Sequence, residues 1–170
     1  MRKIALVVLA VLMCCAYSVI AQTTDVDGWN ETKWGMNEDS VRKIYGDKLL
    51  PSDTAGRPDN KEYNPFMLKG LKIADTDFNV KFWFSKSANT LIKVTLYPAN
   101  QKQTSVYLFK EVNELLTSKY GKQTNSGKDR IEGLSSNWDL KLTKIKTTFN
   151  QSLPVLIISY ESVGDKTGNL

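Results

Sequence analysis

Hydrophobic and polar residues alternate in three segments in the middle of the chain, at positions 71–73, 78–84 and 92–97. A period of two residues is typical of a β-strand with one buried face. In the second and third segments the apolar series runs through even-numbered positions, and the residues between them are largely polar or charged. The pattern predicts three antiparallel strands that bury one face of a sheet.

The first two of these strands are close enough in sequence to form a hairpin. If Asp75 and Thr76 form the turn, Ile73 lies opposite Phe78, and the apolar residues of both strands fall on the same side of the sheet. This register is the one that we expect.

A helical pattern precedes the strands, between Asn37 and Tyr45. Asn37 is a favourable N-terminal cap, and Val41, Ile44 and Tyr45 share one helix face. Gly46 follows, as is common where a helix ends. We therefore expect a short helix with one apolar face.

A second helix is predicted from about Thr104 to Tyr120. Val112, Leu116 and Tyr120 form an apolar stripe at helical spacing, and Gly121 follows the last of them. The two helices thus both end in Tyr-Gly.

Three further strand patterns follow the second helix, around 136–142, 144–149 and 155–160. The predicted order is therefore helix-strand-strand-strand, twice, which predicts an α+β fold of two layers, with two helices on one face of an antiparallel sheet. The repetition fits a tandem duplication with halves 33–100 and 101–163. A second explanation is that Tyr-Gly is simply a good helix terminus.

Two segments rich in turn-forming residues interrupt these patterns, at 51–65 and 124–133. Proline, glycine and asparagine are frequent in the first of them, and neither shows a sustained apolar period. We expect both to be loops.

The ends of the chain differ from the predicted domain, 33–163. Residues 1–21 combine a basic start with an apolar run and a Val-x-Ala ending, which is typical of a secretory signal peptide cleaved after Ala21. Residues 22–32 are polar without a period, so we expect a flexible segment, and 164–170 is expected to be a tail. The mature protein is then periplasmic or extracellular.

The composition changes the picture because the chain has no histidine and only two cysteines, Cys14 and Cys15. Cleavage after Ala21 removes both, and this excludes Ser-His-Asp and Cys-His catalysis and zinc sites made of these residues. A lipid attached to Cys14 or Cys15 is disfavoured, since a small residue should precede the modified cysteine and Met13 precedes Cys14.

Cleavage also removes two positive charges, so the formal net charge falls from +5 to +3. No block of five basic residues is present, and we predict no nucleic-acid partner. The sequence contains no glycine loop that would hold a phosphate and no complete calcium loop, so no cofactor or metal is predicted.

Paired carboxylates are the enzymatic chemistry that such a chain could still perform. Asp75 with Asp77 and Asp129 with Glu132 are the candidates, and both pairs fall in predicted turns, where Asp is frequent for backbone reasons. A small secreted hydrolase that uses carboxylates is therefore the alternative function.

The segment 34–41, with the sequence WGMNEDSV, and the later Gly46 carry a family resemblance. They resemble the opening of small bacterial envelope proteins, among them the small lipoprotein of the outer-membrane β-barrel assembly machine, and of secreted bacterial proteins of unassigned role. The tandem order of elements resembles the β-lactamase inhibitor protein fold. These resemblances imply a non-enzymatic binding protein.

Strand parity selects the residues of a candidate binding surface. If the apolar series of the middle strands faces the helices, then Lys81, Trp83, Lys93 and Tyr97 face away from them. Aromatic rings among lysines suit a protein partner or an anionic envelope component. A second interpretation is that the loop 51–65 covers Trp83. We therefore expect an exported non-enzymatic binding or accessory protein.

Overall fold

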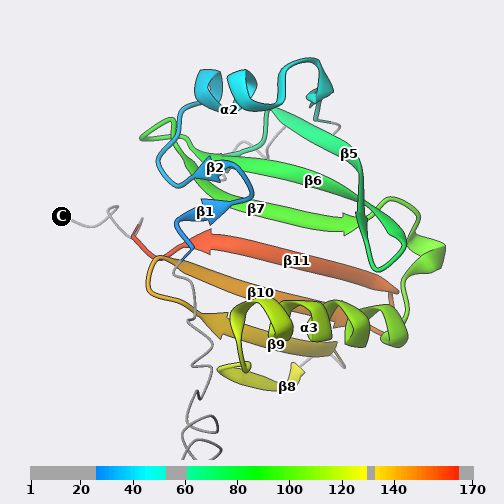
Figure 1. Cartoon of the computed structure of the whole chain (residues 1–170). Helices are drawn as coiled ribbons and strands as arrows, with labels where there is room; N and C mark the ends of the chain where they lie inside the picture. Colours follow the sequence, from blue (N-terminus) through cyan, green and yellow to red (C-terminus); the bar gives the residue numbers. More distant parts are fainter. Residues whose placement is uncertain (1–25, 53–60, 130–132, 165–170) are drawn as a thin grey trace, which may run out of the picture.

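The computed structural model describes residues 26–52, 61–129 and 133–164 (Figure 1). The predicted signal peptide, 1–21, and the last residues of the predicted tail, 165–170, lie outside the described residues. None of the described helices is long and apolar enough to cross a membrane.

An antiparallel sheet of nine strands forms one layer of the protein (Figure 1). The strands follow the order β3-β5-β6-β7-β11-β10-β9-β8, and β4 pairs with β6 beside this path. The predicted α+β class is confirmed. The strands are β3 (Leu50–Pro51), β4 (Glu62–Tyr63), β5 (Phe66–Ile73), β6 (Thr76–Ser85), β7 (Leu91–Pro98), β8 (Asn125–Asp129), β9 (Gly133–Asp139), β10 (Thr143–Asn150) and β11 (Val155–Ser162).

Two runs of three consecutive strands make up most of this sheet. Each run follows a helix, and the last strands of the two runs, β7 and β11, pair antiparallel in the middle of the sheet. The predicted order of elements is therefore present, with short strands added. The segments 51–65 and 124–133, which we expected to be loops, contribute β4, the second residue of β3 and the whole of β8. Strand β8 has the sequence NSGKD, which lacks an apolar period because it is a polar edge strand that pairs only with β9.

The first helix, α2 (Glu38–Tyr45), has the predicted boundaries. The side chain of Asn37 caps it by accepting a hydrogen bond of 2.9 Å from the amide of Ser40. Gly46 ends the helix with a φ of 54°, a value that side chains disfavour. Val41 is fully buried, whereas Ile44 and Tyr45 are half-buried.

The second helix, α3 (Val106–Tyr120), begins two residues later than the sequence predicts. Its cap is Ser105, whose hydroxyl accepts a hydrogen bond of 3.2 Å from the amide of Leu108. A single-turn 3₁₀ helix, η3 (Gln101–Gln103), precedes it, and another, η2 (Gly46–Lys48), follows α2. Gly121 ends α3 as predicted, with a φ of 85°.

The hydrophobic core lies between the helices and the face of the sheet toward them, which we call the inner face. Phe82 of β6 is fully buried at its centre, with its ring centroid 5.4 to 5.9 Å from those of Trp29, Tyr45 and Phe66. The predicted stripe of α3 and the predicted apolar series of β6 are buried in the same cluster. Burial of this apolar surface is the main force that joins the two layers.

Residues 26–32 differ from the flexible polar segment 22–32 that the sequence suggests, of which 22–25 lie outside the described residues. Strands β1 (Gly28–Trp29) and β2 (Thr32–Lys33) form a small hairpin that lies across the inner face between α2 and α3 (Figure 1). Trp29 is only 8% exposed and packs edge-on against Phe82. The burial of one tryptophan thus holds a segment that has no hydrophobic period.

Glycine is required in this hairpin. Gly28 has a φ of 140°, and a Cβ atom built on it would lie 1.9 Å from the carbonyl oxygen of Thr32. The next tryptophan, Trp34, donates a hydrogen bond of 2.8 Å from Nε1 to the hydroxyl of Thr143 on β10. The hydroxyl of Thr143 in turn donates to the carbonyl of Val26. These contacts join the start of the described chain to the sheet.

The register of the first hairpin is shifted by two residues from the expected one. Ile73 pairs with Thr76, because Ala74 and Asp75 form the turn with φ values of 49° and 56°. Two central residues with positive φ match the right-handed twist of the strands, which explains the tighter turn. Phe78 therefore pairs with Leu71, so the apolar residues still share one face.

A β-bulge between β6 and β7 changes the predicted alternation of buried and exposed residues at the start of β7. The β6–β7 ladder is irregular between Trp83 and Phe84, so that Phe84 pairs with Leu91. Leu91 is consequently fully buried on the inner face, whereas Ile92, which the alternation places there, is half-buried. An extra residue in one strand reverses the alternation at that point.

Candidate binding face

The face of the sheet opposite the helices, which we call the outer face, carries the four residues selected from the sequence. Lys81 and Trp83 of β6 and Lys93 and Tyr97 of β7 are all partly exposed, while β6 and β7 bury the side chains between them in the core. Both helices and the β1–β2 hairpin lie on the inner face (Figure 1). The structure thus brings these four residues together on two neighbouring strands.

Each aromatic ring of this group has an ammonium group beside it. Trp83 pairs with Lys93 across the ladder, and Lys93 Nζ lies 5.2 Å from the centroid of the indole. Lys81 Nζ lies at the same distance from the ring of Tyr97. The indole Nε1 of Trp83 also donates a hydrogen bond of 2.8 Å to the hydroxyl of Thr95. These contacts restrict the motion of the rings, so that less conformational entropy would be lost when a partner binds.

The second interpretation of Trp83 is that the segment 51–65 covers its side chain. Part of it, 53–60, lies outside the described residues. The described part forms β4, which pairs with the end of β6, and Glu62 of β4 forms an ion pair with Lys93. Trp83 itself remains partly exposed.

A cavity of about 290 Å³ opens on the outer face beside these rings, and we call it the outer hollow. Its lining comes from β6, from β7, from β11, where Ile157 is 39% exposed, and from the connection between β7 and α3. Most of its lining is apolar. The lining residues are Lys81, Trp83, Thr95, Tyr97, Pro98, Gln101, Thr104, Val155, Leu156 and Ile157.

Two polar atoms near the outer hollow make no hydrogen bond within the described part of the chain. Thr104 lines the hollow and is 9% exposed, and its Oγ1 has no partner there. Asn79 pairs with Tyr97 across the β6–β7 ladder, and its buried Oδ1 has none either. Buried polar atoms are usually hydrogen-bonded. The sequence pattern gave no signal for either residue, because neither lies in a recognisable motif.

Charges alternate in sign along the row of residues that begins at Lys93. Lys93 pairs with Glu161 on β11, Glu161 with Lys144 on β10, and Lys144 with Asp139 on β9. Opposite charges on directly paired residues of one face attract each other. This part of the outer face is therefore close to electrically balanced and is not a basic patch.

Within the described residues, the carboxylate pairs that we considered as candidates for hydrolysis do not form an acidic cleft. Asp77 forms an ion pair of 3.1 Å with Lys72 beside the β5–β6 turn, which also contains Asp75. The side chains of Asp129 and Glu132 lie outside the described residues. Within the described ranges, no group of three or more acidic side chains is arranged to hold a metal ion.

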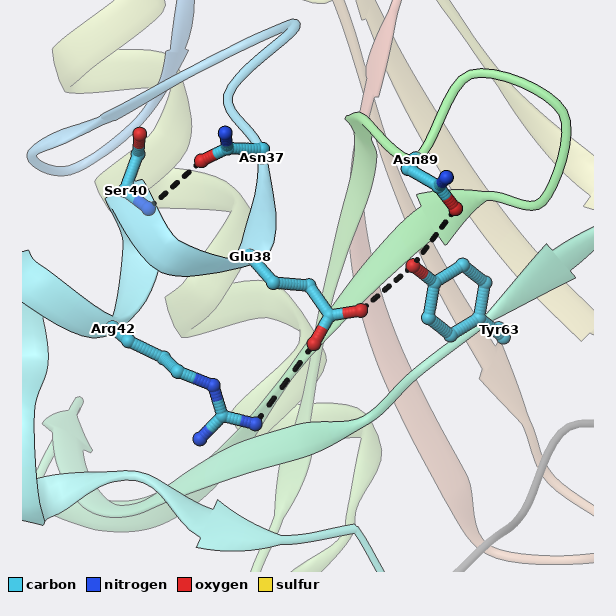
Figure 2. A network of polar contacts seen from close by, with 6 residues as sticks. All are labelled: Asn37, Glu38, Ser40, Arg42, Tyr63 and Asn89. Carbon is cyan, nitrogen blue, oxygen red and sulfur yellow. Dashed lines mark hydrogen bonds and ion pairs between the residues drawn. The ribbon is translucent and has the colours of Figure 1, made fainter.

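Figure 2 shows a separate polar network between α2 and the sheet. The hydroxyl of Tyr63 on β4 donates a hydrogen bond of 2.7 Å to Glu38, which also lies 3.8 Å from the guanidinium of Arg42. Burial, the hydrogen bond to Glu38 and the negative charge of Glu38 together raise the pKa of Tyr63 to about 12, with burial as the largest cause. A phenol with this pKa stays protonated near neutral pH and can keep donating its hydrogen bond to Glu38, so the network joins α2 to β4.

No protein-family model matches this chain, and no curated protein matches it. Among solved structures, it is similar to a DUF4309 family protein, YjgB, from Bacillus subtilis. The two chains are 10% identical, the match covers 83% of this chain and 85% of the other, and the TM-score is 0.43. A similarity at this level transfers neither a fold family nor a function.

Proposed function

We propose that this chain is an exported, non-enzymatic binding protein of the bacterial envelope or exterior, and that it binds a protein partner through the outer face of its sheet. The observation that carries the proposal is the outer hollow, which lies beside the fixed rings of Trp83 and Tyr97 on the face opposite both helices. Aromatic side chains next to an apolar depression are typical of interface hot spots.

The charges of the outer face favour a protein partner over an anionic polymer. Lys93 is paired with Glu62 and faces Glu161, and the next cation, Lys144, lies between Glu161 and Asp139. An anionic polymer binds through a row of uncompensated cations. A protein can match an alternating row and also fill the apolar hollow.

The export part of the proposal rests on the N-terminal sequence and needs its own test. The exported protein should begin at Gln22, after cleavage at Ala21. Intact mass and N-terminal sequencing of the protein recovered from the cell envelope or the medium check this. A product that keeps the apolar run, or that begins at a lipidated Cys15, contradicts it.

Site-specific crosslinking tests the binding part. A photoreactive amino acid is placed at Ile157, on the outer face, and in a matched variant at Tyr107 of α3, which is 78% exposed on the helical layer. We expect a discrete protein adduct in cells from the first position only. Equal adducts from both positions, or none from Ile157, contradict binding through the outer face.

A further inference from the structure

An exposed leucine lies at the same end of the sheet as the outer hollow. Leu153, in the turn between β10 and β11, is 69% exposed and precedes Val155, which lines the hollow, by two residues. Because β11 and β7 pair antiparallel, this turn lies at the same end of the sheet as the connection from β7 to α3 (Figure 1). Leu153 does not belong to the described lining of the hollow in its own chain. This end of the protein therefore presents both an apolar side chain and an apolar hollow.

The size and chemistry of the outer hollow suit a single apolar side chain on a turn. Its volume of about 290 Å³ lies at the lower limit of ligand pockets, which span about 300–1,000 Å³. Residues 151–154, with the sequence QSLP, carry no charge, so their approach to the hollow takes no ionised group out of water. A turn also brings backbone carbonyls, which can accept a hydrogen bond from Thr104 Oγ1, an atom without a partner among the described residues.

A leucine and a hollow at one end of the same face make this surface complementary to itself. When the leucine of one copy enters the hollow of a second copy, a two-fold rotation places the second leucine in the first hollow. The contact then occurs twice, and the assembly closes at two copies. The row of charges that begins at Lys93 alternates in sign, so two copies of the outer face do not repel each other as faces of a single sign would.

We propose that the partner of the outer face is a second copy of this chain, and that Leu153 of each copy enters the outer hollow of the other. The leucine packs against Ile157 and the ring of Trp83, and a carbonyl of its turn accepts the hydrogen bond from Thr104 Oγ1. This inference rests on the proposed function, since it names the partner that the outer face binds. The contact is small, so we expect a reversible dimer with a dissociation constant on the order of 10 μM.

Sedimentation velocity of the exported protein tests this inference. We expect an equilibrium of monomer and dimer without larger species. Leu153→Ala should weaken dimerisation by about a hundredfold, because about tenfold is lost at each of two equivalent contacts. The melting temperature of the dilute monomer should stay unchanged, since Leu153 is exposed there. The matched control is Leu115→Ala, the same change at a leucine of α3 that is 49% exposed, and it should leave the dimer intact.

A mixture of two variants tests whether the leucine and the hollow contact each other. Ile157→Arg places a long charged side chain at the hollow, so this variant and Leu153→Ala should each dimerise poorly alone. Mixed together, the two variants retain one intact leucine and one intact hollow that can meet. We expect a heterodimer about tenfold weaker than the parent dimer and tighter than either variant with itself. A mixture that associates no better than the separate variants overturns the inference.

A monomer at every concentration, or a dimer that Leu153→Ala leaves unchanged, also overturns it. The crosslink from Ile157 distinguishes this failure from a failure of the proposed function. An adduct with twice the mass of the chain supports both, whereas an adduct with a different protein alone overturns the inference and leaves the proposed function standing. A dimer in solution that depends on Leu153, without any adduct from Ile157 in cells, supports the self-association and contradicts the proposed function.

Discussion

Trp83 donates its indole hydrogen to the hydroxyl of Thr95 on the neighbouring strand, over a distance of 2.8 Å, and so holds its ring beside the outer hollow. The cross-strand partner Lys93 places its ammonium 5.2 Å from the same ring. Both contacts lie outside the core cluster on the inner face. A ring held in this way is preorganised for a partner, and its loss should leave the core intact.

Trp83→Ala should therefore weaken partner binding by at least about tenfold, as loss of an interface anchor does, and change the melting temperature little. Binding is measured by titration with the crosslinked partner once it is identified. The matched control is Tyr107→Ala, which removes an exposed aromatic ring from the helical layer and should leave binding unchanged. A large fall in the melting temperature of Trp83→Ala would assign the ring a structural role.

Truncation of a side chain on the inner face should instead lower the stability of the protein. Phe82 is fully buried and contacts three other aromatic rings, so Phe82→Ala should lower the free energy of unfolding by about 3–5 kcal/mol. Urea denaturation measures the change, with Tyr107→Ala again as the exposed control. Similar losses in the two variants would show that the core has been assigned to the wrong face.

The helices and the long strands other than β9 were predictable because each contains a hydrophobic period that burial on one face requires. Strand β9 lies at Gly133–Asp139 and not at the predicted 136–142, because Leu140 and Leu142, which suggested the period, belong to the connection to β10. Within that framework the details depended on single backbone positions. The turn at Ala74 and Asp75 takes positive φ values without a glycine, and the bulge at Phe84 moves Leu91 into the core. Neither feature leaves a signal in the hydrophobic pattern.

Elements held by backbone pairing or by one side chain were missed for the same reason. Strand β8 is polar and pairs along a single edge, and the β1–β2 hairpin depends on Trp29 and on the close approach of Gly28 to Thr32. At the candidate site, strand parity alone was sufficient to group the four predicted residues. Thr104 could not be predicted, because its position depends on how the connection between β7 and α3 returns past the sheet.

The N-terminal hairpin should be sensitive to one glycine. Gly28→Ala places a methyl group against the carbonyl oxygen of Thr32 and forces a side chain into a φ of 140°, so it should lower the free energy of unfolding by about 2 kcal/mol or more. Thermal melts of the exported protein measure this.

Gly127→Ala is the control for that change, since no heavy atom of the described chain lies within 4 Å of the added Cβ there. We expect its melting temperature to stay close to that of the parent. If Gly28→Ala melts at the same temperature as Gly127→Ala, the hairpin does not contribute to the stability of the sheet.

The network of Tyr63 and Glu38 predicts a dependence of stability on alkaline pH. The pKa of Tyr63 is raised to about 12 in the folded protein, first by burial and then by Glu38, whereas an unfolded tyrosine titrates near about 10. The unfolded state therefore loses this proton first as the pH rises. The stability that the network contributes is complete below about pH 10 and is lost between about pH 10 and about pH 12.

Tyr63→Phe should accordingly flatten the fall in the free energy of unfolding across this window, which urea denaturation at several alkaline pH values measures. Absorbance of the phenolate should show one fewer late-titrating tyrosine in the native protein. Glu38→Gln is the second variant, because it keeps a hydrogen-bond acceptor for Tyr63 but removes the charge that raises its pKa. We expect Glu38→Gln to lower the pKa of Tyr63 toward the ordinary value. If the alkaline titration is unchanged in both variants, the late ionisation belongs to a tyrosine other than Tyr63.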